Sequence, residues 1–160
     1  MSAARLRAIG EDDFPALLAL NNLHAAELSW QTPAQFAALL RQACWTRTAG
    51  DGEALLVALD QDADYDNPNF AWLKARFARF IYIDRVVVAQ SLQGQGVAGA
   101  LYRELQTQAR AWDHASLVCE INLDPPNPAS VAFHRRLGFA QIGQADLANG
   151  KRVGYYVCPL

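Results

Sequence analysis

The sequence predicts an α/β fold with a mixed, mostly antiparallel sheet of six or seven strands, about four helices and one central parallel βαβ unit. Two features predict it. The apolar run 80–88 is followed by helical spacing of apolar residues over 98–112 and by a strand-like run at 116–123, the pattern of two parallel strands joined by a helix. Turn signals at 49–52 and 149–150 instead join consecutive strands into antiparallel hairpins.

Two helices are expected near the N-terminus, after a short strand at Arg5–Ile9. The acids at 11–13 offer an N-cap and favourable charges for a first helix, whose apolar residues over 14–20 face inward. Thr32 and Gln35 form a capping box, and a proline takes the first position of the second helix.

The middle of the chain predicts a hairpin followed by the central strand. The β-favouring segments 44–48 and 54–59 flank the glycines of 49–52, so these two strands should pair antiparallel. An acidic loop and a short amphipathic stretch over 70–77 lead into the long strand at 80–88, which is apolar enough to lie centrally in the sheet.

The C-terminal part predicts a helix and a last hairpin. Asn127 is a good N-cap, Pro128 suits the first helical position, and Gly138 suits the helix end. The segments 139–145 and 152–158 then flank Asn149-Gly150, and we expect them to form antiparallel strands.

The composition indicates one folded domain spanning residues 1–160. Of the 160 residues, 52% are hydrophobic and 19% charged, and the net charge of −2 lacks the basic excess of nucleic-acid-binding proteins. No apolar run approaches the ~20 residues that cross a bilayer, and Met1–Gly10 lacks the apolar core of a signal peptide. The 3 cysteines, an odd number, favour reduced thiols. We expect a cytoplasmic protein with neither nucleic acid nor membrane as a partner.

A glycine-rich loop lies between the predicted central strand and the following helix, and it reads Gln93-Gly94-Gln95-Gly96-Val97-Ala98-Gly99. Glycines let the backbone approach a ligand closely, and the N–H groups of a helix's first turn favour an anion. The strand-loop-helix context therefore predicts a diphosphate site. The alternative, in which the glycines serve only a turn and close helix packing, stays open.

The same glycines raise a rival interpretation, a dinucleotide-binding domain. Gly94, Gly96 and Gly99 match G-x-G-x-x-G, and Glu120 follows Gly99 by 21 residues, near the position of a ribose-binding acid. However, the residues 89–93 separate the strand from the first glycine, whereas the dinucleotide turn follows its strand directly. The last strands also favour an antiparallel hairpin over further βα units. This alternative is the weaker one.

At this point the chain resembles the Gcn5-related N-acetyltransferase (GNAT) superfamily, whose members move an acyl group from acyl-coenzyme A to an amine. The family's loop, Gln/Arg-x-x-Gly-x-Gly/Ala, matches residues 93–98, and its helix that begins at an asparagine and ends in Leu-Gly-Phe matches Asn127 and 137–139. The resemblance covers the element order from residue 5 onward and implies the acyl-coenzyme A N-acyltransferase fold.

The resemblance also implies where acetyl-coenzyme A would bind. The diphosphate would lie on Gly94–Gly99, and the pantetheine arm would pair in strand fashion with the backbone of Val86, Val87 and Val88. Asn127 would hold the arm near the reacting end. The same valines also suit the core of a buried strand, and both roles are compatible because the coenzyme would use backbone atoms.

Amine acetylation needs a base, because an alkyl ammonium of pKa ~10.4 must lose a proton before attack. Glu120 is the first candidate, because it lies on the strand beside the expected thioester and some family members use a glutamate there. Asp84 is the second, because it shares a strand face with Val86 and Val88. Either carboxylate can instead be structural, and a register error between Glu120 and Asn122 is open.

The departing thiolate calls for an acid, although a thiol of pKa ~8.5 leaves tolerably without one. The family usually places a tyrosine seven residues after the helix-leading asparagine, and here that position is His134. Histidine can donate a proton near neutral pH, or it can be a helix residue without that role. Tyr82, Tyr155 and Tyr156 are other possible donors. The missing tyrosine motivates a second hypothesis, a coenzyme-binding module with little catalysis.

The acceptor is expected to be a small-molecule or peptide amine. Four aspartates alternate over 60–66 but lack the glycine and glutamate of a calcium loop, and His24 and His114 show no ligand spacing, so no metal is predicted. The acidic loop would favour a cationic amine if it overhangs the acceptor, and is otherwise a solvated loop. Three tryptophans suit either an acceptor pocket or the core: Trp30, Trp45 and Trp72. The resemblance is also compatible with a homodimer.

Overall fold

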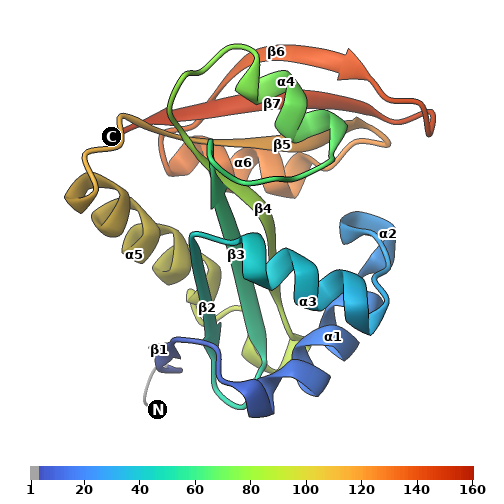
Figure 1. Cartoon of the computed structure of the whole chain (residues 1–160), viewed down its shortest axis with the longest axis vertical. Helices are drawn as coiled ribbons and strands as arrows, with labels where there is room; N and C mark the ends of the chain where they lie inside the picture. The colour runs from blue at the N-terminus through green and yellow to red at the C-terminus, as the bar shows by residue number, and fades with distance from the viewer. Residues whose placement is uncertain (1–3) are drawn as a thin grey trace. The chain divides into compact units, whose positions relative to one another are not determined.

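The computed structural model describes residues 4–160 and has the predicted α/β fold (Figure 1). The described strands hydrogen-bond in the order β1-β2-β3-β4-β5-β7-β6, in a sheet of seven strands that is mostly antiparallel. The strands are β1 (Leu6–Arg7), β2 (Trp45–Ala49), β3 (Ala54–Asp60), β4 (Ile81–Val88), β5 (Ser116–Asp124), β6 (Ala140–Asp146) and β7 (Arg152–Pro159). The α-helices are α1 (Phe14–Leu23), α2 (Ala25–Leu28), α3 (Pro33–Gln42), α4 (Pro68–Lys74), α5 (Val97–Ala111) and α6 (Pro128–Arg136).

The chain divides into two compact units, which we describe separately. Unit 1 consists of the described residues up to Leu59 together with Ile83–Leu105. Unit 2 consists of Asp60–Tyr82 and Gln106–Leu160. Strand β4 and helix α5 each contribute residues to both units.

In unit 1, β2 and β3 form the predicted antiparallel hairpin, with Trp45 opposite Ala58 and Ala49 opposite Ala54. The turn between them requires glycine, because Gly50 and Gly52 have φ angles of 57° and 84°. Strand β1 pairs antiparallel with β2 but is only 2 residues long, shorter than the expected Arg5–Ile9.

Helices α1 and α3 lie side by side in unit 1, and the rings of Phe14 and Phe36 are 5.4 Å apart (Figure 1). The capping box at α3 is confirmed, since the Thr32 side chain accepts from the Gln35 amide. The start of the first helix differs from the expectation. The acids form a 3₁₀ turn at Glu11–Asp13, and the Asp13 side chain bonds to Arg7 and the Gly10 amide instead of capping the helix.

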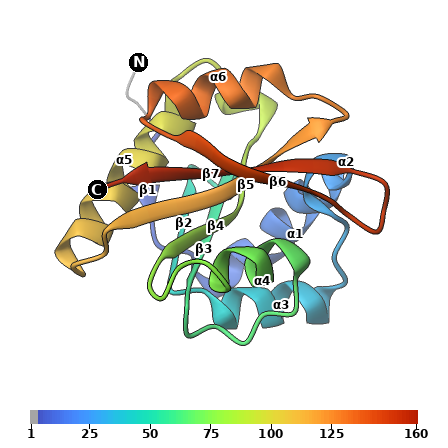
Figure 2. The same ribbon diagram turned by 90° about the horizontal axis from the view of Figure 1, so that it is seen from above.

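In unit 2, β7 pairs antiparallel with both β5 and β6, and the first residues of β4 pair parallel with β5. Ile81 lies opposite Leu117 in the parallel pair, as the βαβ pattern predicts. Helices α4 and α6 cover opposite faces of the strands β5, β7 and β6 (Figure 2). The predicted ends of α6 are confirmed, with Asn127 as N-cap and Gly138 at a φ of 98°.

The described helices number six, more than the four or so expected. The additional ones are short: α2 has 4 residues and α4 has 7. Among the described residues no helix combines the length and apolar character needed to cross a membrane.

Candidate functional site

The glycine loop of unit 1 has the backbone geometry that the sequence predicts. Gly94 and Gly96 have φ angles of 77° and 74°, in the left-handed region that side chains with a Cβ rarely adopt. A Cβ added at either glycine would meet no atom within 4 Å, so the space beside this backbone is open. These glycines are therefore required by backbone conformation and leave room for a ligand.

Helix α5 begins directly after these glycines, at Val97. Its first helical hydrogen bond runs from the Ala100 amide to the Gly96 carbonyl at 3.0 Å. The amides of the preceding turn have no acceptor within the helix, and the helix dipole gives this end a partial positive charge. The loop is thus suited to an anion.

Arg103 adds a cation next to this turn. A Cβ on Gly99 would lie 3.1 Å from Nη1 of Arg103, which places the guanidinium beside the first turn of α5. Arg103 was not among the site residues predicted from the sequence. Its spacing of four residues from Gly99, one helical turn, was the available signal.

The five residues between β4 and Gly94 are ordered by contacts within unit 1. A 3₁₀ turn at Gln90–Leu92 occupies them, and the Ser91 hydroxyl donates to Glu53 Oε2 at 2.6 Å, which lowers the pKa of that carboxyl. Gln93 Nε2 donates to the Val88 carbonyl at 3.3 Å. The spacer that distinguishes this loop from a dinucleotide fingerprint is therefore a folded turn.

The three valines of β4 alternate in burial. Val87 is buried, whereas Val86 and Val88 are half-buried. The residues just before them form an ion pair, since Arg85 Nε lies 2.6 Å from Asp84 Oδ2 with both side chains almost fully enclosed. Arg85 also donates to Asn21 Oδ1 at 2.7 Å. Asp84, the second candidate base, thus has a structural partner.

In unit 2, Glu120 on β5 accepts hydrogen bonds on both carboxylate oxygens. The Tyr82 hydroxyl donates to Oε2 at 2.7 Å, and Asn69 Nδ2 donates to Oε1 at 3.2 Å. Tyr155 on β7 in turn donates to Asn69 Oδ1 at 2.9 Å. Glu120 itself is half-buried while its partners are buried, so its carboxylate lies at the edge of a polar cluster.

Tyr155 is held by an aromatic stack. Trp72 of α4 lies 3.9 Å from the Tyr155 ring at an angle of 13°, and the Arg76 guanidinium lies 3.5 Å from the Trp72 ring centroid. Gly143 on β6 permits this arrangement, because a Cβ there would be 2.7 Å from the Trp72 ring. Burial, followed by the negative charge of Glu120, raises the pKa of Tyr155 to about 12, so this hydroxyl keeps its proton.

Asn127 begins α6 at the rim of a cavity in unit 2. Its side chain accepts from the Ser130 amide at 3.2 Å. The cavity has a volume of about 310 Å³ and is lined by Asn122, Leu123, Pro126, Asn127, Pro128, Val131, Ala132 and Arg135. Asn122, the residue that a register error would have put in the place of Glu120, lines this cavity, whereas Glu120 does not.

His134 is buried in unit 2 with 6% of its surface exposed. Its Nδ1 lies 2.8 Å from the Ser130 carbonyl oxygen, and its ring packs edge-on against Phe133 and Phe139. Burial lowers the pKa of His134, so the imidazole is neutral at pH 7. Of the other possible donors, the Tyr156 hydroxyl donates to Gln141 Oε1 at 3.4 Å.

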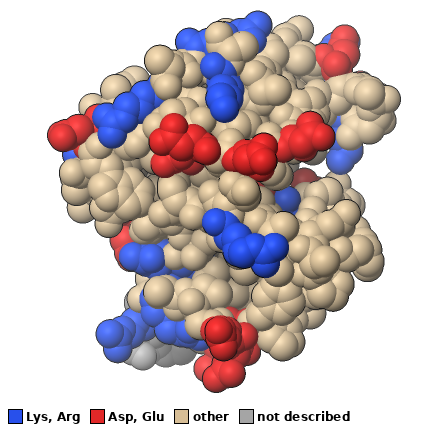
Figure 3. All heavy atoms as spheres, viewed as in Figure 1, with Lys and Arg blue, Asp and Glu red and all other residues tan. Residues whose placement is uncertain are grey.

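The acidic loop before α4 is on the surface, where Figure 3 shows a row of acidic side chains. Asp62, Asp64 and Asp66 are exposed, and the Asp62 amide donates to Asp60 Oδ1 at 2.9 Å. Within residues 4–160, no cluster of three metal-ligating side chains occurs. The tryptophans differ in burial: Trp45 belongs to the core, Trp72 is half-buried and Trp30 is 61% exposed.

Each unit therefore brings together part of the predicted site. In unit 1 these are the valines of β4 and the glycine loop, and Arg103 is an additional residue beside Gly99. In unit 2 they are Glu120 with its hydroxyl and amide donors, and Asn127 at its cavity. Asn69 was not predicted as a site residue. Asn67 is the N-cap of α4, and nothing in the local sequence indicates that the Asn69 side chain reaches β5.

Comparisons with known proteins agree with this description. A family model described as the acetyltransferase (GNAT) family matches residues 18–139. No curated protein sequence matches the chain. Among solved structures, Ard1 from Thermoplasma volcanium is similar with a TM-score of 0.78 and 15% identity, covering 99% of each chain.

Two further structures illustrate the similarity. The ribosomal-protein-S18-alanine N-acetyltransferase from Escherichia coli has a TM-score of 0.71 and 16% identity, covering 98% of this chain and 93% of that one. A chain of the NatC complex bound to Gag peptide and CoA has a TM-score of 0.76 and 15% identity, covering 99% of each. At these identities the structures establish the fold.

Proposed function

Because this chain belongs to the GNAT family of acetyltransferases, we propose that it transfers the acetyl group of acetyl-coenzyme A to a primary amine by direct attack in a ternary complex. In this proposal residues 1–160 act as a single N-acetyltransferase domain. The observation that carries it is the open, positive-φ loop at Gly94 and Gly96, followed directly by the N-terminus of α5.

The loop and Arg103 supply what a diphosphate requires. The residues Gln93 to Gly99 would present backbone N–H groups to the diphosphate, and the Arg103 guanidinium would add a charge-assisted hydrogen bond. The half-buried Val86 and Val88 would offer backbone to the pantetheine arm, and Asn127 would hold the arm further along. Solved structures of similar fold are described as bound to CoA.

Glu120 is our candidate for the base. Deprotonating an alkyl ammonium at pH 7 costs about 4.6 kcal/mol, at about 1.36 kcal/mol per pKa unit, so the reaction gains from a base or a water path to one. The Glu120 carboxylate accepts hydrogen bonds from two neutral donors, the Tyr82 hydroxyl and the Asn69 amide. These bonds hold the carboxylate in a fixed orientation on β5 and favour its ionised form, the form that a general base needs.

Asp84 and His134 have smaller parts in the proposal. Asp84 is paired with Arg85, which keeps its charge engaged within unit 1. His134 is the candidate acid, and its contribution is minor. A neutral imidazole carries one proton, and here Nδ1 holds it and donates to the Ser130 carbonyl oxygen, so Nε2 has no proton to give. A thiol leaving group of pKa ~8.5 needs little acid assistance.

A cationic amine, on a small molecule or a peptide, is the proposed acceptor. The exposed carboxylates of Asp62, Asp64 and Asp66 would raise the local concentration of a cation. A similar structure is described as bound to a peptide and CoA, which supports a peptide amine as one form of the acceptor. The described cysteines Cys44, Cys119 and Cys158 form no disulfide, which fits a reducing compartment, for which we propose the cytoplasm.

The proposal is tested by incubating the protein with acetyl-coenzyme A and a panel of amines and peptides. Thiol release that depends on an amine, with an acetylated product found by mass spectrometry, is the expected result. Calorimetric binding of coenzyme A without release for any amine would instead indicate a coenzyme-binding module. Thermal stabilisation by NAD and none by coenzyme A would indicate the dinucleotide alternative.

A further inference from the structure

Helix α4 brings an amide side chain to the carboxylate proposed as the base. We propose that Asn69 is a positioning residue for Glu120, held in its orientation by Tyr155, and that this set of contacts maintains Glu120 as an oriented carboxylate ready to take the acceptor's proton. This inference rests on the proposed function, because it assigns a role to residues that act through Glu120.

The hydrogen-bond pattern fixes the direction of the Asn69 amide. Its Oδ1 accepts from the Tyr155 hydroxyl at 2.9 Å, so its Nδ2 faces Glu120 Oε1 at 3.2 Å. Tyr155 keeps its proton throughout the neutral range because its pKa is raised to about 12. Asn69 is 8% exposed and Tyr155 1% exposed, so water has little access to compete for these bonds.

Asn69 and Tyr155 are each held in place by further contacts. Asn69 is the second residue of α4, and the Asn67 side chain caps that helix by accepting from the amides of Asn69 and Phe70. The Trp72 ring stacks on Tyr155. The Asn69 amide is therefore fixed by its own helix and by its partner on β7.

The cluster favours the ionised form of Glu120. Neutral donors on both carboxylate oxygens stabilise the anion and oppose its protonation. Titratable groups that interact with this cluster include Tyr82, Tyr155 and the thiol of Cys119, whose pKa is raised in part by the Glu120 charge. The positive charge of Arg76 lowers the pKa of Tyr155, whereas the negative charge of Glu120 raises it. Removing the Asn69 donor should raise the pH at which Glu120 loses its proton.

The test follows Glu120 in two ways in the full-length protein. The carboxyl ¹³C signal of Glu120, assigned with Glu120→Gln, is titrated by NMR, and kcat is measured from pH 4 to pH 8. Asn69→Leu, of similar volume, should shift the carboxyl titration and the acidic limb of kcat upward by about one pH unit, which lowers kcat about tenfold on that limb. Tyr155→Phe, which retains the stack, should give a smaller shift. The KM for acetyl-coenzyme A should change little in both.

Asn67→Ala is the matched control, because it weakens the cap of α4 and removes no atom bonded to Glu120. It should leave both titrations in place. The inference is overturned if Asn67→Ala shifts the Glu120 titration as much as Asn69→Leu does, or if Asn69→Leu does not shift it. If Asn69→Leu does not fold, an unchanged Glu120 titration in Tyr155→Phe overturns the inference. The NMR titration also reports on a protein without acetyl transfer, so a shift without activity would reject the proposed function and retain the contact.

Discussion

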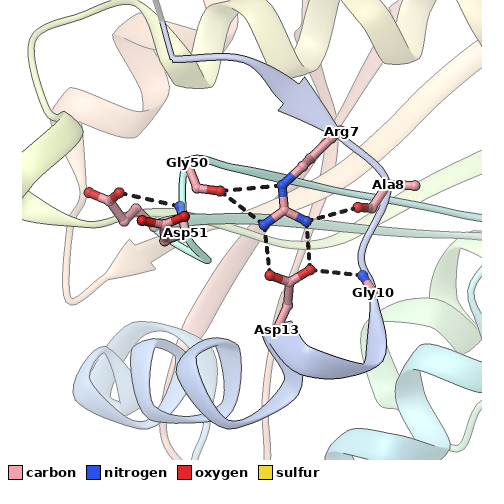
Figure 4. A network of polar contacts seen from close by, with 7 residues as sticks. Arg7, Ala8, Gly10, Asp13, Gly50 and Asp51 are labelled. Atoms are coloured by element: carbon pink, nitrogen blue, oxygen red, sulfur yellow. Dashed lines mark hydrogen bonds and ion pairs between the residues drawn. The ribbon is translucent and has the colours of Figure 1, made fainter.

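Arg7 and Asp13 form a two-pronged ion pair in unit 1, with Nη1 to Oδ2 and Nη2 to Oδ1 both at 2.7 Å (Figure 4). The Arg7 guanidinium also donates to the Gly50 carbonyl at 2.9 Å, and Asp13 accepts from the Gly10 amide at 2.8 Å. These contacts join β1 to the start of α1 and to the β2–β3 turn. The bond from Arg7, followed by that from the Gly10 amide, lowers the pKa of Asp13 to about 2.

Replacing Arg7 by glutamine should destabilise the fold in a pH-dependent way. A carboxyl whose pKa is lowered on folding stabilises the protein above its ordinary pKa of 3.8, and this stabilisation is lost as the pH falls toward 2. The urea midpoint of Arg7→Gln should therefore be lower than that of the wild type by a constant amount between pH 5 and pH 8. The difference should shrink between pH 4 and pH 2, and a difference that persists undiminished at pH 2 would contradict this account.

Gly96→Ala should weaken coenzyme A binding through backbone conformation alone. At a φ of 74°, an alanine costs roughly 1–2 kcal/mol, although its Cβ would have open space. Gly150→Ala is the control, because Gly150 has a φ of 86°, similar open space and a place in the β6–β7 turn. If the alanine relaxes the free loop, the coenzyme must draw it back to a positive φ on binding, so the cost appears as lost affinity. Calorimetry should therefore show an affinity loss of about tenfold for Gly96→Ala and none for Gly150→Ala, and equal affinities would remove the loop from the coenzyme site.

The helix caps, hairpin turns and βαβ unit were predictable because their determinants are local. Thr32 and Gln35 lie one turn apart and cap each other, and the positive φ of Gly150 is a property of one residue in one turn. Asp13 shows where such reasoning fails. Its position suits an N-cap, yet its side chain bonds to Arg7, six residues earlier, and this competition cannot be seen in the local pattern.

The candidate site divides in the same way. The glycine loop is contiguous in sequence, so its residues and their conformation could be predicted together. The surroundings of Glu120 could not, because Asn69 and Tyr155 lie 51 and 35 positions away and meet it only when α4 and β7 pack around β5. A structural role for Asp84 was one of the expectations from the sequence, but its ion pair with Arg85, the burial of both side chains and the bond from Arg85 to Asn21 required the structure.

Asp84→Asn should affect stability more than catalysis. The substitution leaves the buried Arg85 guanidinium without its ion-pair partner, which costs about 3–5 kcal/mol of unfolding free energy. The double variant Asp84→Asn with Arg85→Met should recover much of that loss, since neither charge of this pair remains. The pH dependence of kcat in the double variant should match the wild type. Loss of the acidic limb there would identify Asp84 as the base.

His134→Phe should retain acetyl transfer to within about tenfold, because a thiolate whose thiol has a pKa of ~8.5 departs with little acid assistance. Its stability should respond to acid in a characteristic way. Since burial lowers the pKa of His134 on folding, the wild type loses stability as the pH falls below the ordinary histidine pKa of 6.5, and the phenylalanine variant lacks this loss. Melting temperatures at pH 7.5 and pH 5.5 test this. A kcat loss of a thousandfold without unfolding would establish His134 as the acid.

Contact between the diphosphate of the coenzyme and the backbone amides at 94–99 is the central claim. The most direct measurement is a ¹H–¹⁵N NMR titration of the labelled protein with coenzyme A, with NAD as the comparison ligand. The account predicts saturable shifts that are largest for the amides from Gly94 to Gly99 with coenzyme A, and none with NAD. Saturation by coenzyme A that leaves those amides unshifted, or no binding at all, would contradict it.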